Sequence, residues 1–179
     1  MKMLTISAAA LALLVCSAEP SGAKDTFTLG SEAFADGGRI PHKHSYNGYG
    51  CTGKNISPEL HWSNAPQGTK SFALTVFDPD ANKGKGWWHW VVYGIDPGVH
   101  ALAAGEPPAG IEGKTDFGTS GWGGPCPPPG DPAHHYEFTL YALDTKVPSG
   151  SESLTGPDLL ETIKDHMLGK ATLVGRFAR

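Results

Sequence analysis

The sequence predicts a single, mainly β domain of the antiparallel sandwich type, with one peripheral helix near the C-terminus. Three segments are rich in β-branched and aromatic residues, which is typical of strands: 71–77, 87–95 and 136–143. A helical period of apolar residues appears only after the last of them. The 179 residues contain no internal repeat and no linker that would divide a domain. A run of strands followed by one helix and a further strand indicates a layered β fold.

The first 23 residues have the pattern of a secretory signal peptide. Lys2 precedes an apolar run at 4–15, and small residues stand before a cleavage position after Ala23. The apolar run is too short to span a membrane. The sequence therefore predicts a mature domain over 24–179 that is periplasmic or secreted and has no transmembrane segment. Two alternatives remain, a lipid anchor at Cys16 in a lipobox-like Leu-Leu-Val-Cys, and a buried N-terminal helix.

The charge of the mature domain excludes some classes of partner. The whole chain has 14 basic and 18 acidic side chains, and loss of Lys2 and Glu19 with the signal leaves 13 and 17, so the net charge stays at −4. A mildly acidic chain without basic runs has no electrostatic footprint for nucleic acid or an acidic membrane surface. Any anion that it binds must be held by local geometry.

Two cysteines remain after the signal is removed, Cys51 and Cys126. An even pair in an oxidising compartment predicts a disulfide. Such a bond would tie the 42–57 loop to the proline-rich loop. Two buried free thiols are the alternative.

The chain opens with an edge strand and a long loop region. Residues 26–29 alternate polar and apolar side chains, as an edge strand does. Residues 30–58 are rich in Gly, Ser, Asn and His, which predicts loops in which His42 and His44 are exposed to solvent. Residues 55–62 combine a turn with a short strand.

The central strand is predicted at 71–77, because this segment is apolar on both faces. It stops at the turn sequence Asp-Pro-Asp-Ala at 78–81, and a flexible link leads to the second buried strand at 87–95. His89 lies inside this strand. Residues 96–119 are predicted to be loop.

A segment rich in glycine and proline, at 118–133, precedes the third strand. Its glycines let the backbone approach a ligand closely, and its prolines stiffen the chain. Long loops are usually functional or disordered, and the aromatic and histidine side chains around this one argue against disorder. We therefore expect it to form one wall of a site, with His134 and His135 at the entrance of the next strand.

The C-terminal region combines a helix with a closing strand at 171–177. Pro157 stands at the predicted first helical position and Gly169 beyond the helix end. Four apolar side chains fall on one helical face: Leu159, Leu160, Ile163 and Met167.

Carboxylates and imidazoles gather where the predicted strands end. Asp78 and Asp80 follow the central strand, and alternation along the third strand allows only one residue of the pair His134 and His135 to reach a common site. Asp78 would orient an imidazole by accepting its N–H. Protonated histidines and loop N–H groups would then form an anion site of phosphate size, with His89 as a further member.

Other interpretations of the same residues remain. A strand histidine is more often a core residue, an Asp-Pro-Asp is usually a turn, and most of the tryptophans are expected in the core. A mononuclear metal site from Asp78, Asp80, His89 and His134 is chemically conceivable. The sequence contains no nucleophile elbow and no zinc-ligand spacing. The residues alone thus indicate an exported β domain with a small polar pocket.

Several motifs together resemble the phosphatidylethanolamine-binding protein family, in particular its bacterial Raf-kinase-inhibitor-like branch. They are S-P-E-L-H-W at 57–62, D-P-D-A at 78–81, W-W-H-W-V-V-Y at 87–93, and G-W-G-G-P-C-P-P-P-G through H-H-Y at 121–136. The resemblance covers residues 26–178. It implies a β fold with a small, solvent-open pocket for phosphate-type anions and phosphorylethanolamine-type head groups.

The resemblance also implies which residues bind the ligand. The motif matches carry the pocket onto Asp78, Asp80, His89, Trp122, Gly123, Gly124, Pro125, His134 and Tyr136. His135 stands where the family usually has Arg, and Trp122 replaces a common Tyr. The C-terminal helix that partly covers the pocket in mammalian members is not evident here.

The predicted function is that of an exported, non-enzymatic protein that binds a small phosphate-type anion or a phosphorylethanolamine-like head group. It would need no metal or cofactor and would modulate or inhibit an extracytoplasmic partner protein. If protonated histidines drive binding, affinity should fall as the pH rises past about 6.5. The alternatives are a hydrolase that uses the same His/Asp pocket, and an interaction module of the protease-inhibitor type.

Overall fold

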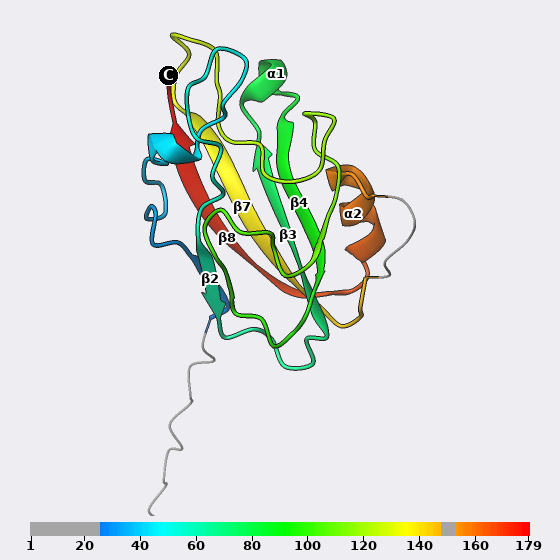
Figure 1. The fold of residues 1–179 in the computed structure, drawn as a ribbon. Coiled ribbons are helices and arrows are strands. Elements are labelled where there is room, and N and C mark those ends of the chain that lie inside the picture. The colour runs from blue at the N-terminus through cyan, green and yellow to red at the C-terminus, as the bar shows by residue number, and fades with distance from the viewer. Residues whose placement is uncertain (1–25, 148–152) are drawn as a thin grey trace, which may run out of the picture.

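The computed structural model describes residues 26–147 and 153–179, so the predicted signal peptide and Cys16 lie outside the described residues. The elements are the strands β1 (Thr28–Gly30), β2 (Leu60–Ser63), β3 (Ser71–Asp78), β4 (Trp87–Ile95), β5 (Ala101–Leu102), β6 (Ile111–Glu112), β7 (His134–Leu143) and β8 (Met167–Phe177), with the helices η1 (His42–His44), α1 (Ala81–Gly84) and α2 (Gly156–Ile163). They form the predicted mainly β, antiparallel architecture with one C-terminal helix (Figure 1).

The main sheet has five strands in the order β6-β4-β3-β7-β8. β3 lies at its centre and pairs antiparallel with β4 and β7, so that Asp78 is opposite Trp87, and Phe77 is opposite Glu137. This register brings the turn after β3 beside the start of β7. The prediction of a central strand at 71–77 is therefore confirmed, and it explains why residues 56 positions apart in sequence meet at the site.

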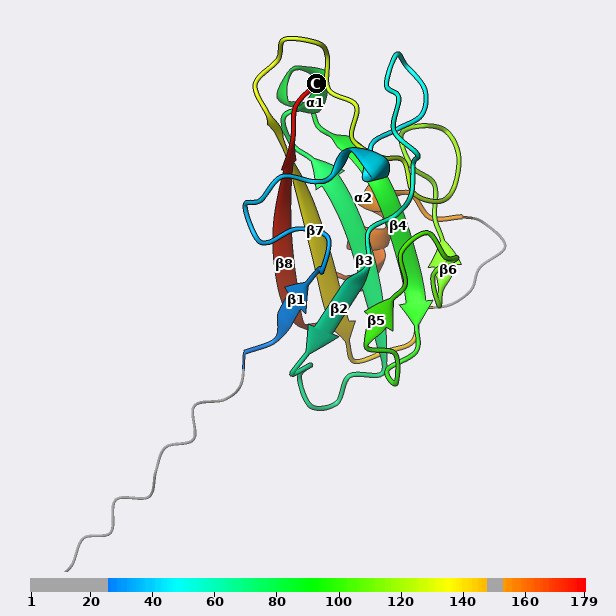
Figure 2. The same ribbon diagram turned by 60° about the vertical axis from the view of Figure 1, so that its left-hand side comes forward.

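Two apolar cores lie on opposite faces of this sheet. Phe72 on β3 packs in the larger core beneath the smaller sheet, whose order is β1-β2-β5, whereas Ala73 packs in a second core with Leu159 and Ile163 of α2. Figure 2 shows the small sheet in front of the large one and α2 behind it. Alternation along a doubly covered strand thus accounts for the continuous apolar run at 71–77.

The C-terminal helix is shorter than the sequence predicts. α2 begins with a capping box between Thr155 and Asp158 but ends at Ile163, and Met167 is already the first residue of β8. The His166 ring donates to Asp144 Oδ1 at 2.8 Å, which ties the turn after α2 to the end of β7. The extensive pairing of β8 with β7 therefore overrides the helical period, and Met167 is 40% exposed rather than part of the helix core face.

The loops at one end of the sandwich are cross-linked to one another. A disulfide joins Cys51 to Cys126 across 75 residues, which confirms the predicted pairing. His44 is buried, not exposed as the sequence predicts. Its Nδ1–H donates to the carbonyl of Ile56 at 2.7 Å, and the backbone carbonyl of His44 accepts the indole N–H of Trp122 at 3.1 Å. Burial lowers the pKa of His44.

Candidate ligand pocket

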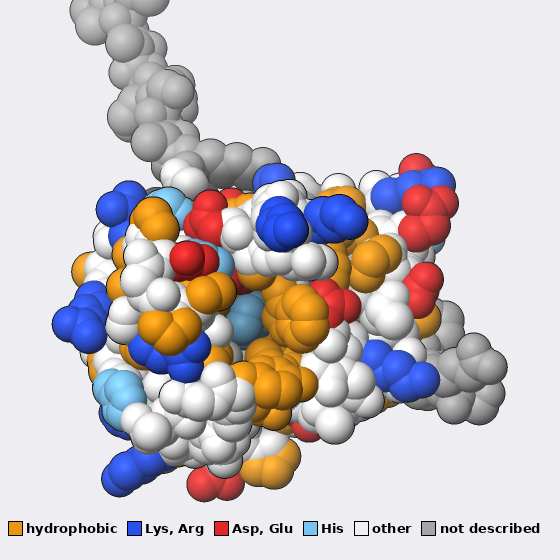
Figure 3. All heavy atoms as spheres, turned by 90° about the horizontal axis from the view of Figure 1, so that it is seen from above, with side chains coloured by type: hydrophobic (Ala, Val, Ile, Leu, Met, Phe, Trp, Pro, Cys, Tyr) orange, Lys and Arg blue, Asp and Glu red, His pale blue; other side chains and the backbone are white. Residues whose placement is uncertain are grey.

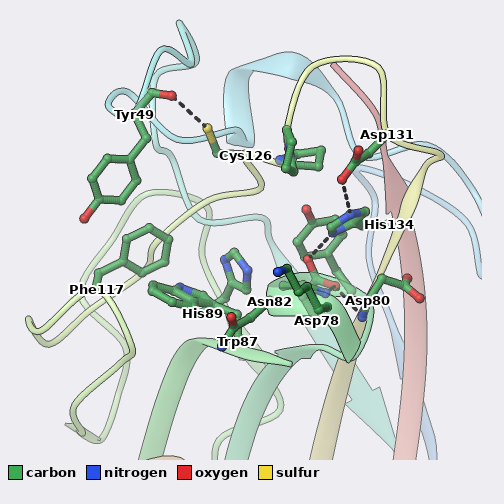
Figure 4. Close-up of a pocket in the computed structure, with 15 residues that line it drawn as sticks. Tyr49, Asp78, Asp80, Asn82, Trp87, His89, Phe117, Cys126, Asp131 and His134 are labelled. Atoms are coloured by element: carbon green, nitrogen blue, oxygen red, sulfur yellow. Dashed lines mark hydrogen bonds and ion pairs between the residues drawn. The ribbon is translucent and has the colours of Figure 1, made fainter. Parts of the chain in front are cut away.

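A cavity of about 610 Å³ opens among these cross-linked loops at the end of β3, β4 and β7. Figure 3 shows this end from above, with hydrophobic and histidine side chains around the hollow and acidic ones near its rim. The lining combines aromatic, acidic and imidazole groups: Tyr49, Asp78, Asp80, Ala81, Asn82, Lys83, Trp87, His89, Phe117, Cys126, Pro127, Pro128, Asp131, His134 and Tyr136 (Figure 4).

Asp78 organises one side of the pocket. It is buried at the end of β3, and its Oδ1 accepts the amide N–H groups of Asp80 at 2.9 Å and Ala81 at 3.1 Å. Its Oδ2 accepts the Nδ1–H of His134 at 2.8 Å. The same carboxylate therefore fixes the turn and the imidazole, as the sequence predicts. The other ring nitrogen of His134 is 3.7 Å from Asp131 Oδ2.

Asp80 does not support the pocket histidine. Its Oδ2 accepts the backbone N–H of His135 at 2.7 Å and the His135 ring Nδ1–H at 2.8 Å. Partial burial acts to raise the pKa of Asp80, but these two hydrogen bonds outweigh it and hold the pKa below its usual value. His135 is outside the pocket lining, so the prediction that only one of the two adjacent histidines reaches the site is confirmed.

His89 is a neutral member of the pocket. Its Nδ1–H donates to the carbonyl of Gly123 at 2.6 Å, and burial lowers its pKa from 6.5 to about 4. The expectation of a protonated His89 is therefore wrong near neutral pH, because the backbone carbonyls and the Asp78 and Asp116 carboxylates near the ring do not offset the desolvation of an imidazolium. Its Nε2, which has no hydrogen-bond partner among the described residues, is left as an acceptor.

Tyr136 brings an unpaired hydroxyl to the site. The residue is fully buried, its ring packs edge-on against that of His89, and its hydroxyl has no hydrogen-bond partner within the described part of the chain. Burial and the nearby Asp78 carboxylate raise its pKa, so the hydroxyl stays protonated. The hydroxyl lies near the Asp78 carboxylate without a hydrogen bond of normal geometry to it, so a ligand oxygen can accept this donor.

The glycine-rich loop supports the pocket from behind. The N–H of Gly123 donates to the His89 carbonyl at 2.9 Å, and the N–H of Gly124 donates to Asn55 Oδ1 at 2.8 Å. Both amides are thus occupied and are not free for an anion, contrary to the sequence-based expectation. A Cβ at Gly124 would come within 2.1 Å of the His44 carbonyl oxygen, so this glycine allows a close approach to another loop rather than to a ligand.

Trp122 and Pro125 also lie outside the lining. The Trp122 ring packs against Trp90 and Phe138 in the larger core, and the Pro125 carbonyl accepts the N–H of Tyr46 at 3.0 Å. Of the nine residues that the resemblance implied, the structure brings Asp78, Asp80, His89, His134 and Tyr136 together in one cavity. The other four hold the loop in place.

The sequence suggests an apolar rim that includes Trp87, which does line the pocket, but sequence reasoning missed Tyr49, Phe117 and two charged groups. Phe117 packs between Tyr49 and Trp87, with Tyr49 71% exposed at the mouth. The only sequence feature that pointed to Asp131 as a pocket residue is its position three residues before His134. No sequence feature pointed to Lys83. The lining therefore carries three carboxylates and one ammonium group, so the pocket is not cationic overall.

The four side chains considered for a metal line the same cavity but are not arranged as a set of metal ligands. Within 26–147 and 153–179, no group of three or more His, Cys, Asp or Glu side chains is arranged to hold a metal ion. Asp80 is hydrogen-bonded to His135, and Asp78 is hydrogen-bonded to His134.

The described part of the chain also has no helix long and apolar enough to cross a bilayer.

The fold and the cavity together define an antiparallel β protein with an open pocket of mixed polarity at one end of the sandwich. The sequence profile of the phosphatidylethanolamine-binding protein family matches residues 30–178. Escherichia coli YbcL, named as a UPF0098 protein, is 44% identical over 162 residues, which make up 86% of each chain. Mycobacterium tuberculosis LppC, whose name is that of a proposed lipoprotein, is 41% identical over 169 residues, 93% of this chain and 79% of that protein.

Solved structures agree with the sequence matches. The crystal structure of E. coli YbcL, described as a new member of the mammalian PEBP family, gives a TM-score of 0.80 at 37% identity over 86% of this chain and 98% of that one. A homologue from Chlamydia trachomatis gives a TM-score of 0.75 at 38% identity over 86% and 97%. This chain belongs to the phosphatidylethanolamine-binding protein family.

Proposed function

We propose that this protein binds a phosphoryl head group that still carries one proton, and that it binds this ligand without turning it over. The observation that carries the proposal is the convergence of the unpaired Tyr136 hydroxyl, the Asp78-anchored His134 and the neutral His89 on one open cavity. His89 comes from β4, and His134 and Tyr136 come from β7, on the other side of the central strand β3.

The donors and acceptors of the pocket match a phosphomonoester monoanion. The Tyr136 hydroxyl donates to one phosphoryl oxygen, and His89 Nε2 accepts from the remaining P–O–H. In its imidazolium form, His134 donates from Nε2 to a second oxygen while its Nδ1–H stays on Asp78. A fully ionised phosphate would lose the bond to His89 and would be repelled by the three carboxylates of the lining.

The acidic and aromatic groups suit the other end of a zwitterionic head group. A primary ammonium group, as in phosphorylethanolamine, is attracted by Asp80 and Asp131 and packs favourably on the faces of Trp87 and Phe117. The same groups would disfavour a purely anionic molecule. We therefore place phosphorylethanolamine-like ligands ahead of free phosphate.

Binding rather than hydrolysis is favoured by the side chains present. In the part of the chain that the structure describes, no serine, threonine or free thiol lines the pocket, and Cys126 is bonded to Cys51. A hydrolase would have to use one of the carboxylates or an activated water. Release of inorganic phosphate from the ligand, followed by ³¹P NMR, would support that alternative.

We further propose that the protein works outside the cytoplasm and acts on a partner there. The leader-like N-terminal sequence, the disulfide, and the lipoprotein name of the mycobacterial relative all support an envelope location. The partner protein would contact the open mouth of the pocket, so that occupancy by the head group modulates the contact.

The test is an NMR and calorimetric titration of the mature chain with phosphorylethanolamine. His134→Ala should abolish saturable binding, whereas the matched variant His135→Ala, on the neighbouring residue outside the pocket, should bind normally. Affinity should fall between pH about 5.5 and about 8, because the phosphoryl group loses its last proton near pH 6. Equal affinity at both pH values, or equal loss in the two histidine variants, would contradict the proposal.

A further inference from the structure

A second cavity lies on the other side of the disulfide from the ligand pocket. It has a volume of about 350 Å³ and is formed by the 39–52 region and the C-terminal residues after β8. Its lining is Arg39, His42, Ser45, Gly50, Cys51, Thr52, Phe177, Ala178 and Arg179. Cys51 borders this cavity and Cys126 borders the ligand pocket, so the two sites are separate. We call it the arginine cleft.

The arginine cleft concentrates the guanidinium groups of an acidic protein. The chain has a net charge of −4 and three arginines: Arg39, Arg176 and Arg179. Two of them line the cleft, and the backbone of the third forms a β-bridge with that of Arg39. No acidic side chain lines the cleft, and none of the three arginines forms an ion pair within the described residues.

The arrangement has the chemistry of a receptor for an oxyanion. Two guanidinium groups that line one cleft give it a positive potential, which an anion bound between them would neutralise. Each guanidinium offers parallel N–H donors whose spacing matches two oxygens of a phosphate. The Arg179 Nη1–H group donates to the carbonyl of Tyr49 at 3.3 Å, which holds this side chain against the rim of the cleft. The Thr52 hydroxyl lies 3.3 Å from His42 Nε2 and adds a further polar group.

We propose that the arginine cleft is a second ligand site, which takes phosphate or the phosphomonoester group of a larger molecule. It differs in charge from the ligand pocket, whose lining has three carboxylates. The pocket is thus suited to a zwitterionic head group and the cleft to a fully ionised phosphate. The proposal does not depend on the function proposed for the pocket.

The test is an NMR titration with inorganic phosphate against chloride at equal ionic strength, on the mature chain at pH about 8, where phosphate is mainly the dianion. Amide shifts should saturate at 39–52 and 177–179. The double variant Arg39→Gln with Arg179→Gln should bind about tenfold or more weakly, since it loses two charge-assisted contacts. Arg176→Gln removes the same charge outside the cleft and is the matched control, and all three residues are exposed, so the variants should fold.

The outcomes separate this site from the pocket and separate the sources of the anion. His134→Ala should leave the cleft shifts unchanged, whatever it does to phosphorylethanolamine. Co-sedimentation with phosphatidylcholine vesicles that contain phosphatidic acid, lost in the double variant, would identify a lipid source, whereas phosphate binding without sedimentation would identify a soluble one. Affinity of the double variant within twofold of the parent chain, or an equal loss in Arg176→Gln, would overturn the proposal.

Discussion

Acidification should destabilise this protein through His89, by an amount that the structure sets. The folded state lowers the pKa of His89 from 6.5 to about 4 because the ring is buried against the Gly123 carbonyl. Between these values the unfolded chain binds a proton that the folded chain does not, so stability rises with pH across this window and falls as the pH drops from about 6.5 to about 4. A shift of this size corresponds to about 3 kcal/mol.

Chemical denaturation of the mature chain at pH about 7 and about 4, compared with His89→Gln, measures this contribution. The Gln side chain can donate its amide N–H to the same carbonyl but does not titrate. His44 and Asp80, whose pKa values are also lowered in the folded state, contribute equally to the pH dependence of both proteins, so the difference between the two losses isolates His89. We expect the parent chain to lose about 3 kcal/mol more than the variant. Equal losses would refute the assignment of a neutral, desolvated imidazole.

Three further tests, each by substitution, address the support of the pocket. Asp78→Asn removes a buried carboxylate that accepts three hydrogen bonds, so it should lower the free energy of unfolding by about 2 kcal/mol in urea denaturation. Asp80 is more exposed, and Asp80→Asn should lower it clearly less. Similar losses in the two variants would argue against Asp78 as the anchor. Tyr136→Phe should leave the melting temperature unchanged or slightly raised, because the hydroxyl that it removes has no hydrogen-bond partner within the described residues. The same variant should bind phosphorylethanolamine about tenfold more weakly in calorimetry. Unchanged affinity would show that the hydroxyl is not part of the site. Replacing Cys51 and Cys126 by Ser should lower the free energy of unfolding by about 4 kcal/mol, because the disulfide closes a loop of 75 residues. A loss below about 1 kcal/mol in chemical denaturation would show that packing alone holds the loops.

The members of the pocket that the sequence could predict are those at the ends of strands. Asp78 ends a strand that is apolar on both faces, and His134 and Tyr136 alternate with outward-facing residues on the next strand of the sheet. Strand period and order are local signals, and they place these side chains on one edge without any knowledge of the loops. The family resemblance added the expectation that they contact a ligand.

The parts that could not be predicted depend on contacts between distant loops. The amide of Gly124 is occupied by Asn55, 69 residues away, and the ring of Phe117 reaches the pocket from a loop with no period at all. The neutrality of His89 follows from its burial, which the sequence does not report. Met167 has the spacing of a helix residue, but pairing of β8 with β7 decides its conformation.

The origin of the pocket walls determines what a ligand can do to this molecule. The walls come from the ends of β3, β4 and β7 and from loops near residues 49, 117 and 126–131, and they meet only when the sheet has formed and the loops have docked on it. No single segment of the chain contains all the residues of the pocket. A head group that binds as proposed would therefore stabilise the whole domain against unfolding. We expect it to slow hydrogen exchange even at the slowest amides of the central strands, far from the ligand.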